Sequence, residues 1–126
     1  MDKIGQRKSQ KRQRILEVIQ AAQGPLTVNE IHEKLSDDPV GIATVYRTIK
    51  LLLEKKEIQD VMLADGVVRY ENKDLGHHHH FYCEACEQVF DIADCHVDHH
   101  EYHLPTGFKV KAHEMTFYGL CPDCQD

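Results

Sequence analysis

Two Cys-x-x-Cys pairs are the residues best spaced for metal chemistry in this chain: Cys83 with Cys86, and Cys121 with Cys124. Each pair can present two thiolates on one turn, and two such turns complete a tetrahedral zinc site with Zn–S distances of ~2.3 Å. Four thiolates close the zinc shell, so this zinc is expected to be structural. A redox-active Cys-x-x-Cys is the alternative, which the presence of two pairs without a thioredoxin-like pattern disfavours.

Four consecutive histidines, His77–His80, precede the first cysteine pair. If they lie on a strand, alternate side chains face opposite sides, so His78 and His80 share one face and His77 and His79 share the other. The run therefore predicts two pairs of ligands for two ions rather than four ligands for one. Each pair needs further partners, and the nearby candidates are Glu71, Asp74, Asp91, Asp94, Asp98 and His113. A solvated histidine loop is the alternative.

A second histidine-rich stretch, CHVDHHEYH, follows at residues 95–103. At helical spacing, four of its histidines lie along one side: His96, His99, His100 and His103. Such a side is either a polar, solvated face or a further metal-binding surface, and the pattern leaves both open. Cys95 is likewise either a small hydrophobic side chain or a reactive thiol.

The elements that precede these motifs have the order of a winged helix-turn-helix. Helices are expected over residues 9–22, 28–36 and 41–56. The first has an apolar stripe at helical spacing, and Thr27 with Glu30 forms a capping box at the start of the second. Two short β-type runs then flank Ala64-Asp65-Gly66, a hairpin turn signal. Three helices and a hairpin favour a winged helix over residues 1–72, against the alternative of a generic helical bundle.

Residues 73–126 are expected to form a small α/β domain with the order strand, strand, helix, strand. The first two strands flank the first cysteine pair, and the helix covers residues 93–103. The last strand is expected from the alternating apolar residues Phe108, Val110 and Ala112. A domain of about fifty residues buries little apolar surface, so it needs a metal, a partner chain or both.

Charge is divided unevenly along the chain. Residues 1–60 carry 11 Lys and Arg against 9 Asp and Glu, whereas residues 61–126 carry 4 against 12. A basic N-terminal half and an acidic, ligand-rich C-terminal half are expected if the first binds a polyanion and the second binds cations. No apolar run reaches the ~20 residues of a membrane span, and the charged N-terminal stretch lacks the apolar region of a signal peptide. We therefore expect a cytoplasmic protein without a membrane partner.

The motifs do not support an enzyme. A zinc hydrolase or deaminase needs an open three-ligand zinc with a glutamate general base. Neither H-x-E…P-C-x-x-C nor H-E-x-x-H occurs in the chain, so no catalytic activity and no small-molecule substrate are expected. A His-rich metal-buffering protein is the alternative from another class, and it would not need a basic N-terminal half.

The chain resembles the ferric uptake regulator family of metal-responsive bacterial repressors over nearly its full length. The resemblance rests on GIATVYRTI (41–49), HHHHFYCEAC (77–86) and FYGLCPDC (117–124). It implies a homodimer whose winged helices bind a palindromic double-stranded DNA operator and whose C-terminal domains pair. The fold class is then α+β: an N-terminal winged helix-turn-helix followed by a small α/β dimerisation domain with a four-cysteine zinc site. The DNA-binding residues that the resemblance implies are Thr44, Tyr46, Arg47, Arg7 and Arg12.

The resemblance also implies two metal sites in addition to the structural zinc. The regulatory site would use Glu71, His78, His80 and Asp91, and the second site would use His77, His79, Asp98 and His113. Iron or zinc, or else manganese, is the divalent metal expected at the regulatory site, where its binding favours the DNA-binding dimer. A peroxide-sensing or zinc-uptake member of the same family is the alternative. The histidine that relatives often contribute from the loop before the second helix is replaced here by Pro25.

Overall fold

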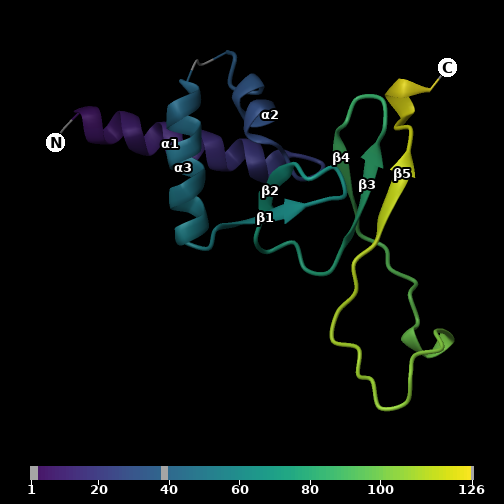
Figure 1. Ribbon diagram of the computed structural model, residues 1–126. Helices are drawn as coiled ribbons and strands as arrows, with labels where there is room; N and C mark the ends of the chain where they lie inside the picture. The colour runs from purple at the N-terminus through teal and green to yellow at the C-terminus, as the bar shows by residue number, and fades with distance from the viewer. Residues whose placement is uncertain (1–2, 38–39, 126) are drawn as a thin grey trace. The chain divides into compact units, whose positions relative to one another are not determined.

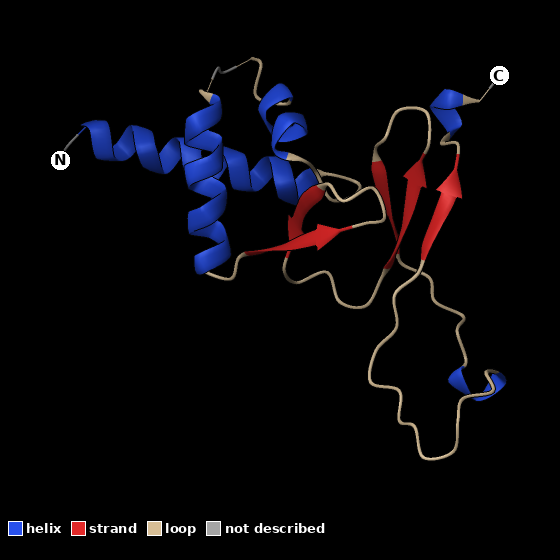
Figure 2. Cartoon of the chain, viewed as in Figure 1, coloured by secondary structure: helices blue, strands red, loops and turns tan. Residues whose placement is uncertain are grey.

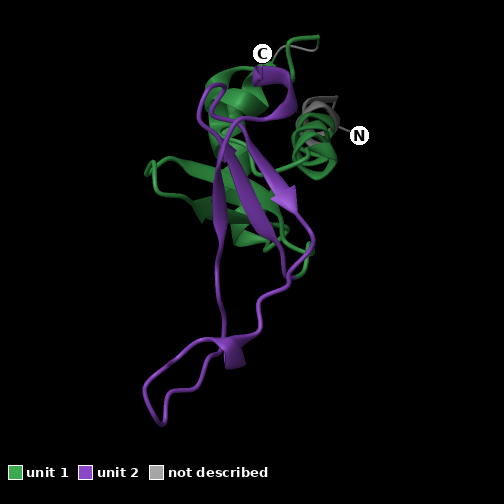
Figure 3. Ribbon diagram, turned by 90° about the vertical axis from the view of Figure 1, so that its right-hand side faces the viewer, with its two compact units in different colours: residues 1–76 green, residues 77–126 purple. Residues whose placement is uncertain are grey.

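The computed structural model describes residues 3–37 and 40–125, and the chain divides into two compact units, residues 1–76 and 77–126 (Figure 3). We call them unit 1 and unit 2. Within the described residues, unit 1 holds three helices and a two-stranded sheet, and unit 2 holds a three-stranded sheet and two short 3-10 helices (Figure 2). The described helices include none with the length and apolar character needed to cross a membrane.

The helices of unit 1 begin where the sequence provides a cap or a run of helix-forming residues. Helix α1 (Lys3–Ala21) starts earlier than the expected residue 9, because Lys, Arg and Gln extend a helix without an apolar face. Helix α2 (Val28–Glu33) starts at the predicted capping box: Glu30 N donates to Thr27 Oγ1 at 3.1 Å, and Thr27 N donates to Glu30 Oε1 at 2.9 Å. Helix α3 (Ile42–Glu54) follows Gly41.

The apolar core of unit 1 is formed by all three helices and the first strand. Its best-buried members are Ile15, Ile31, Leu35, Val45 and Ile58. Burial of each such side chain contributes ~1.5–3 kcal/mol. Helix α3 packs Val45, Ile49 and Leu52 into this core, which leaves its opposite face outside, where Tyr46 is 57% exposed.

Strands β1 (Ile58–Met62) and β2 (Val68–Asn72) form the predicted hairpin, with Ile58 opposite Asn72. The turn is held by Asp65, whose carboxylate accepts from Val67 N at 3.1 Å and from both terminal nitrogens of Arg69 at 3.2 and 2.9 Å. Gly66 has a φ of +76°, a conformation that glycine adopts without strain. The Asp-Gly turn signal is therefore confirmed at its predicted position.

Unit 2 is built on β3 (His79–Cys83), with β4 (Val89–Ile92) antiparallel on one side and β5 (Thr116–Gly119) parallel on the other (Figure 1). This topology brings the start of β3, the end of β4 and the start of β5 to the same end of the sheet. The opposite end collects the end of β3, the turn into β4 and the residues after β5. Each end can therefore gather side chains from three separate segments.

The segment between β4 and β5 differs from the sequence prediction. The helix expected over residues 93–103 is reduced to the 3-10 helix η1 (His99–Glu101), and Phe108, Val110 and Ala112 lie outside any strand (Figure 2). Both predictions were wrong. Residues 93–103 have no apolar stripe that would stabilise a helix by packing. The alternating residues have no neighbouring strand among the described residues, and Phe108 is 69% exposed.

Few side chains of unit 2 are buried. Among its described residues these are His79, Cys83, Val89 and Cys121. Three of the four are candidate metal ligands, so unit 2 is organised around its donor groups rather than around an apolar core.

Candidate metal centres and DNA-binding surface

The four cysteines of the two pairs lie together at one end of the unit 2 sheet. Cys83 ends β3, Cys86 lies in the turn to β4, Cys121 follows β5, and Cys124 ends the 3-10 helix η2 (Pro122–Cys124). All four are free thiols, and their ligand atoms lie within 4.8 Å of one another. The Sγ atoms of Cys86 and Cys121 are 3.9 Å apart. Sulfur ligands of a tetrahedral zinc lie ~3.8 Å apart, so the group fits the ion.

Backbone groups of the same turns stabilise a thiolate at Cys83. The N–H groups of Cys86 and Cys121 donate to Cys83 Sγ at 3.5 and 3.4 Å, and these hydrogen bonds lower the pKa of Cys83 to about 6. Contacts with the side chains of Cys121 and Cys83 raise the pKa of Cys124 to about 12, because adjacent sulfurs resist carrying several negative charges together. A zinc ion resolves this conflict, since it binds thiolates and displaces their protons.

A second donor group lies on one face of β3 and β4. The Nε2 atoms of His78 and His80 are each 3.6 Å from Asp91 Oδ1, and His80 is paired with Asp91 across the two strands. A separation of 3.6 Å is long for a hydrogen bond, but it is close to the ~3.3 Å between nitrogen and oxygen ligands of one tetrahedral ion. The structure thus brings together three of the four residues expected at the regulatory site within unit 2.

Glu71, the fourth expected residue, belongs to unit 1. It lies on β2 opposite Gln59, its side chain is 3% exposed, and its Oε1 accepts a hydrogen bond from Gln59 Nε2 at 2.8 Å. A buried carboxylate is costly unless it is hydrogen-bonded or bound to a cation. Pro25, at the position where relatives often contribute a histidine, is buried and has no side-chain atom that could bind a metal.

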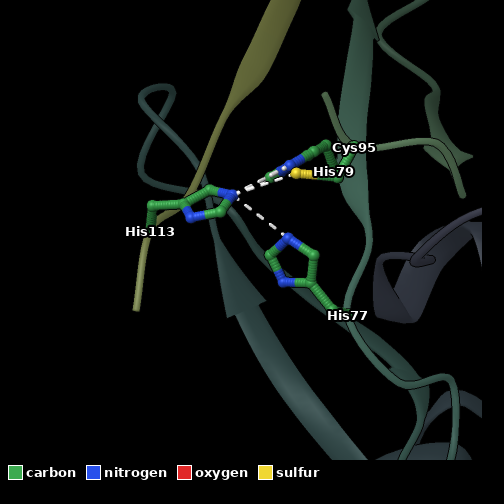
Figure 4. A group of neighbouring side chains, drawn as sticks. All are labelled: His77, His79, Cys95 and His113. Carbon is green, nitrogen blue, oxygen red and sulfur yellow. Dashed lines mark hydrogen bonds between the residues drawn. The ribbon is translucent and has the colours of Figure 1, made fainter. Parts of the chain in front are cut away.

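A third donor group combines histidines and a thiol at the His79 end of β3 (Figure 4). The Nε2 atom of His113 lies 3.1 Å from His77 Nε2 and 3.3 Å from His79 Nε2. It also lies 3.3 Å from Cys95 Sγ. Asp98, the acid expected in this site, is not among the donors that the structure brings together. Its Oδ1 instead accepts from the backbone N–H of His100 at 2.9 Å, as the cap of η1.

Burial favours the neutral form of two histidines of this third group, His79 and His113. Desolvation lowers the pKa of His79, which is 2% exposed, and the neighbouring imidazoles lower it further. The pKa of His113 is lowered in the same way. Neutral imidazoles have a lone pair available for a metal at pH 7. Two neighbours of His113 were not predicted as members of this site: Cys95, and His99, whose Nε2 lies 2.8 Å from His113 Nδ1. Only the His/Cys-rich composition of residues 95–103 could have suggested them.

The outer face of α3 has the side chains expected to contact DNA. Tyr46 and Arg47 are exposed, and Arg47 Nη2 donates to Thr44 Oγ1 at 3.2 Å. A hollow between α1 and α3 is lined by Lys11, Arg12, Thr44, Arg47, Thr48 and Leu51. Three cationic side chains therefore border one surface depression. Arg7 lies within α1, and its side chain is outside the described part of the structure.

A winged helical unit followed by a unit of metal-donor groups defines a class of protein, and the comparisons identify it. The chain belongs to the ferric uptake regulator family, whose sequence model matches residues 3–118; the resemblance seen in the sequence is confirmed. The chain is 38% identical over 90 residues to the ferric uptake regulation protein of Bacillus subtilis, across 68% of this chain and 60% of that protein. It is 32% identical over 127 residues to the peroxide-responsive repressor PerR of Staphylococcus saprophyticus, across 97% of this chain and 84% of that protein.

Solved structures agree with this assignment. The crystal structure of the ferric uptake regulator Fur of Vibrio cholerae aligns with a TM-score of 0.66 and 25% identity, over 87% of this chain and 88% of that one. The α+β fold class expected from the sequence is confirmed. The chain spans less than two thirds of the length of the Bacillus relative.

Proposed function

We propose that this chain is a metal-dependent DNA-binding transcriptional regulator, a repressor that binds a palindromic operator as a homodimer when its regulatory site holds a divalent metal. One observation carries the proposal: a single chain combines an exposed Tyr46–Arg47 pair on α3 with a compact donor group of His78, His80 and Asp91. The first feature suits DNA, and the second suits a divalent cation.

DNA contact is proposed to be centred on α3. An arginine recognises guanine or a phosphate through paired N–H groups, and an aromatic ring packs on thymine methyl groups. Arg47 and Tyr46 have these roles in the proposal. Lys11 and Arg12, which share the hollow with Arg47, are placed to contact the phosphate backbone. Arg7 and Thr44 are proposed as additional backbone contacts.

A second copy of the chain is the proposed partner of unit 2. Strand β5 pairs with β3 on one side only among the described residues. Phe117 and Tyr118 of β5 are 48% and 49% exposed, and Leu120 is 46% exposed. An unpaired strand edge can pair with another chain, and exposed apolar side chains mark an interaction surface. A two-fold dimer places the same edge on both copies and presents two α3 helices to two half-sites of a palindrome.

The proposed regulatory ligands are Glu71, His78, His80 and Asp91. Mixed imidazole and carboxylate ligands suit iron(II), zinc and manganese, and we favour iron or zinc. The four cysteines are proposed to hold a structural zinc, and the histidines of the third group to hold a further divalent ion. Metal acts by binding the DNA-competent arrangement of the dimer more tightly than the alternatives.

DNA binding by protein that retains its four-cysteine zinc tests the proposal. Duplexes selected from a random pool are titrated, by fluorescence anisotropy, with a mild chelator or with added iron(II), zinc or manganese. Metal is expected to tighten binding by ~5–150-fold. His80→Ala should abolish that gain, whereas Arg47→Ala should weaken binding with or without metal. Lys34→Ala, a loss of charge at the exposed end of α2, is the matched control.

Equal binding with chelator and with metal would overturn metal dependence. Failure to select any DNA sequence would favour the His-rich metal-buffering protein instead.

Peroxide sensing through bound iron is the second candidate function. It is favoured by the similarity to the Staphylococcus saprophyticus PerR along 97% of this chain. Hydrogen peroxide should then add one oxygen atom to a ligand histidine of the iron-loaded protein. Mass spectrometry of the peptide that carries His78 and His80 measures this. An unmodified peptide after peroxide treatment would exclude it.

A further inference from the structure

We propose that Cys95 supplies a thiolate ligand to the second metal site and completes a tetrahedral centre with His77, His79 and His113, in which His99 orients the ring of His113. The thiolate makes this site selective for zinc over iron and manganese. The inference deepens the proposed function by naming a ligand and a metal class for that site. It rests on the proposed function in one respect only: that this metal site belongs to a metal-dependent regulator.

The distances between the donors are those of ligands around one ion. Three contacts of 3.1, 3.3 and 3.3 Å converge on a single atom, His113 Nε2. An imidazole nitrogen has either one proton or one lone pair, so it makes one good hydrogen bond and not three. Nitrogen and sulfur ligands of a tetrahedral zinc lie ~3.3–3.6 Å apart. One cation among the donors accounts for all three contacts, with small adjustments of the side chains.

The sheet holds these donors in place. Cys95 lies three residues after the end of β4, and His113 lies three residues before the start of β5. Both strands pair with β3, at whose start His79 lies. The donors are therefore attached to short segments anchored in the sheet, and Figure 4 shows their side chains pointing toward one another. Asp98 lies further along the loop, where its carboxylate caps η1.

His99 gives His113 the tautomer that a metal requires. The contact of 2.8 Å between His99 Nε2 and His113 Nδ1 is a hydrogen bond. When His113 Nδ1–H is the donor, the lone pair of His113 Nε2 faces the other three ligands. Metal-binding histidines commonly donate their second N–H group in this way, which fixes the ring and increases the basicity of the ligand nitrogen. His99 is thus a positioning residue for the site.

The burial of His79 is explained by the same ion. Its ring is 2% exposed, and its Nδ1 has no hydrogen-bond partner among the described residues. A buried polar group without a partner costs free energy and calls for an explanation such as an ion. Coordination through Nε2 would leave the proton on Nδ1 and would compensate for the burial of the ring as a whole. A thiolate ligand then makes the site prefer zinc, because soft sulfur ligands favour zinc, whereas hard oxygen ligands favour manganese.

Alkylation of Cys95 tests the inference without DNA, so it can fail or succeed independently of the proposed function. Zinc-retaining protein is treated with N-ethylmaleimide, and the modified Cys95 peptide is quantified by mass spectrometry. Zinc at ten times its Kd should slow alkylation ~10-fold, in the wild type and in Asp98→Asn, whereas manganese should not. His99→Ala should raise the zinc concentration needed to protect Cys95 from alkylation by ~10–100-fold. His100→Ala, its neighbour, is the control and should leave that concentration unchanged.

Cobalt spectroscopy provides a second readout. Cobalt(II) added to protein whose four-cysteine site holds zinc should produce a thiolate-to-cobalt charge-transfer band that is lost in Cys95→Ser and kept in Asp98→Asn. The opposite result, with the band kept in Cys95→Ser, would overturn the assignment. Zinc protection of Cys95 that persists in His113→Ala would overturn it as well. Circular dichroism of each variant establishes that the fold is retained.

Discussion

Removal of zinc from the four-cysteine site is expected to unfold unit 2 while unit 1 stays folded. Val89 is the only buried side chain of unit 2, among its described residues, that is not a candidate ligand. Burial of a valine contributes ~1.5–3 kcal/mol, whereas a structural zinc contributes ~10–16 kcal/mol at pH 7. The apolar term is too small to replace the metal. Unit 1 has its own core around Ile15 and Ile31, which does not depend on zinc.

Hydrogen exchange measured by mass spectrometry tests this on reduced, chelator-stripped protein and on Cys121→Ser. Peptides from β3 to β5 should lose their protection, and peptides from α1 and α3 should keep it. Returned zinc should restore the stripped wild type but not the variant. His100→Ala, an exposed substitution outside both donor groups, should leave the sheet protected. Protection of β3 to β5 that persists in zinc-free protein would refute the reasoning, because apolar contacts or a partner chain would then be sufficient to hold unit 2.

Unit 1 provides three further tests. Thr27→Ala removes the cap of α2 and should lower the free energy of unfolding by ~1 kcal/mol in urea titrations, with the exposed Asn29→Ala as control. The Arg69 guanidinium holds the pKa of Asp65 below its ordinary value of 3.8. The ion pair therefore stabilises the folded state at any pH above 3.8. This stabilisation is lost as the pH falls through the lower pKa that Asp65 has in the folded state. Asp65→Asn should therefore lower the free energy of unfolding by ~1 kcal/mol at neutral pH, a small value because Asp65 is partly solvated. In strong acid it should leave the free energy of unfolding unchanged. An equal loss at both pH values would contradict the ion pair. Arg47→Ala should weaken binding to selected DNA by ~1–3 kcal/mol, and unchanged affinity would remove Arg47 from the interface.

Local signals made most of unit 1 predictable from the sequence. The capping box at Thr27 and Glu30 and the Asp65-Gly66 turn are each set by residues within four positions of one another. These features need no knowledge of the rest of the fold. The apolar stripes of α1 and α3 added the core-facing sides. Alternation along His77–His80 likewise anticipated that His78 and His80 would approach one acid while His77 and His79 approached another group of donors.

The segment between β4 and β5 was not predictable because its structure is set by contacts between distant residues. The histidines of residues 95–103 have helical spacing, but spacing without an apolar stripe does not stabilise a helix. The alternating residues near Phe108 have strand spacing, but a strand also needs a neighbour. Cys95 has no motif partner in the sequence. Its position beside His113 depends on the return of the chain to the same end of the sheet.

Strands β3 and β5 each have candidate metal ligands near both of their ends. His79 begins β3 and Cys83 ends it, while His113 precedes β5 and Cys121 follows it. A slip of one residue between the strands would turn side chains to the wrong face and separate the donors at both ends at once. The ions proposed for these two sites would therefore both bind only when the strands are correctly aligned. Under the proposal, full metal content would measure correct folding, because a misaligned sheet would lose both ions.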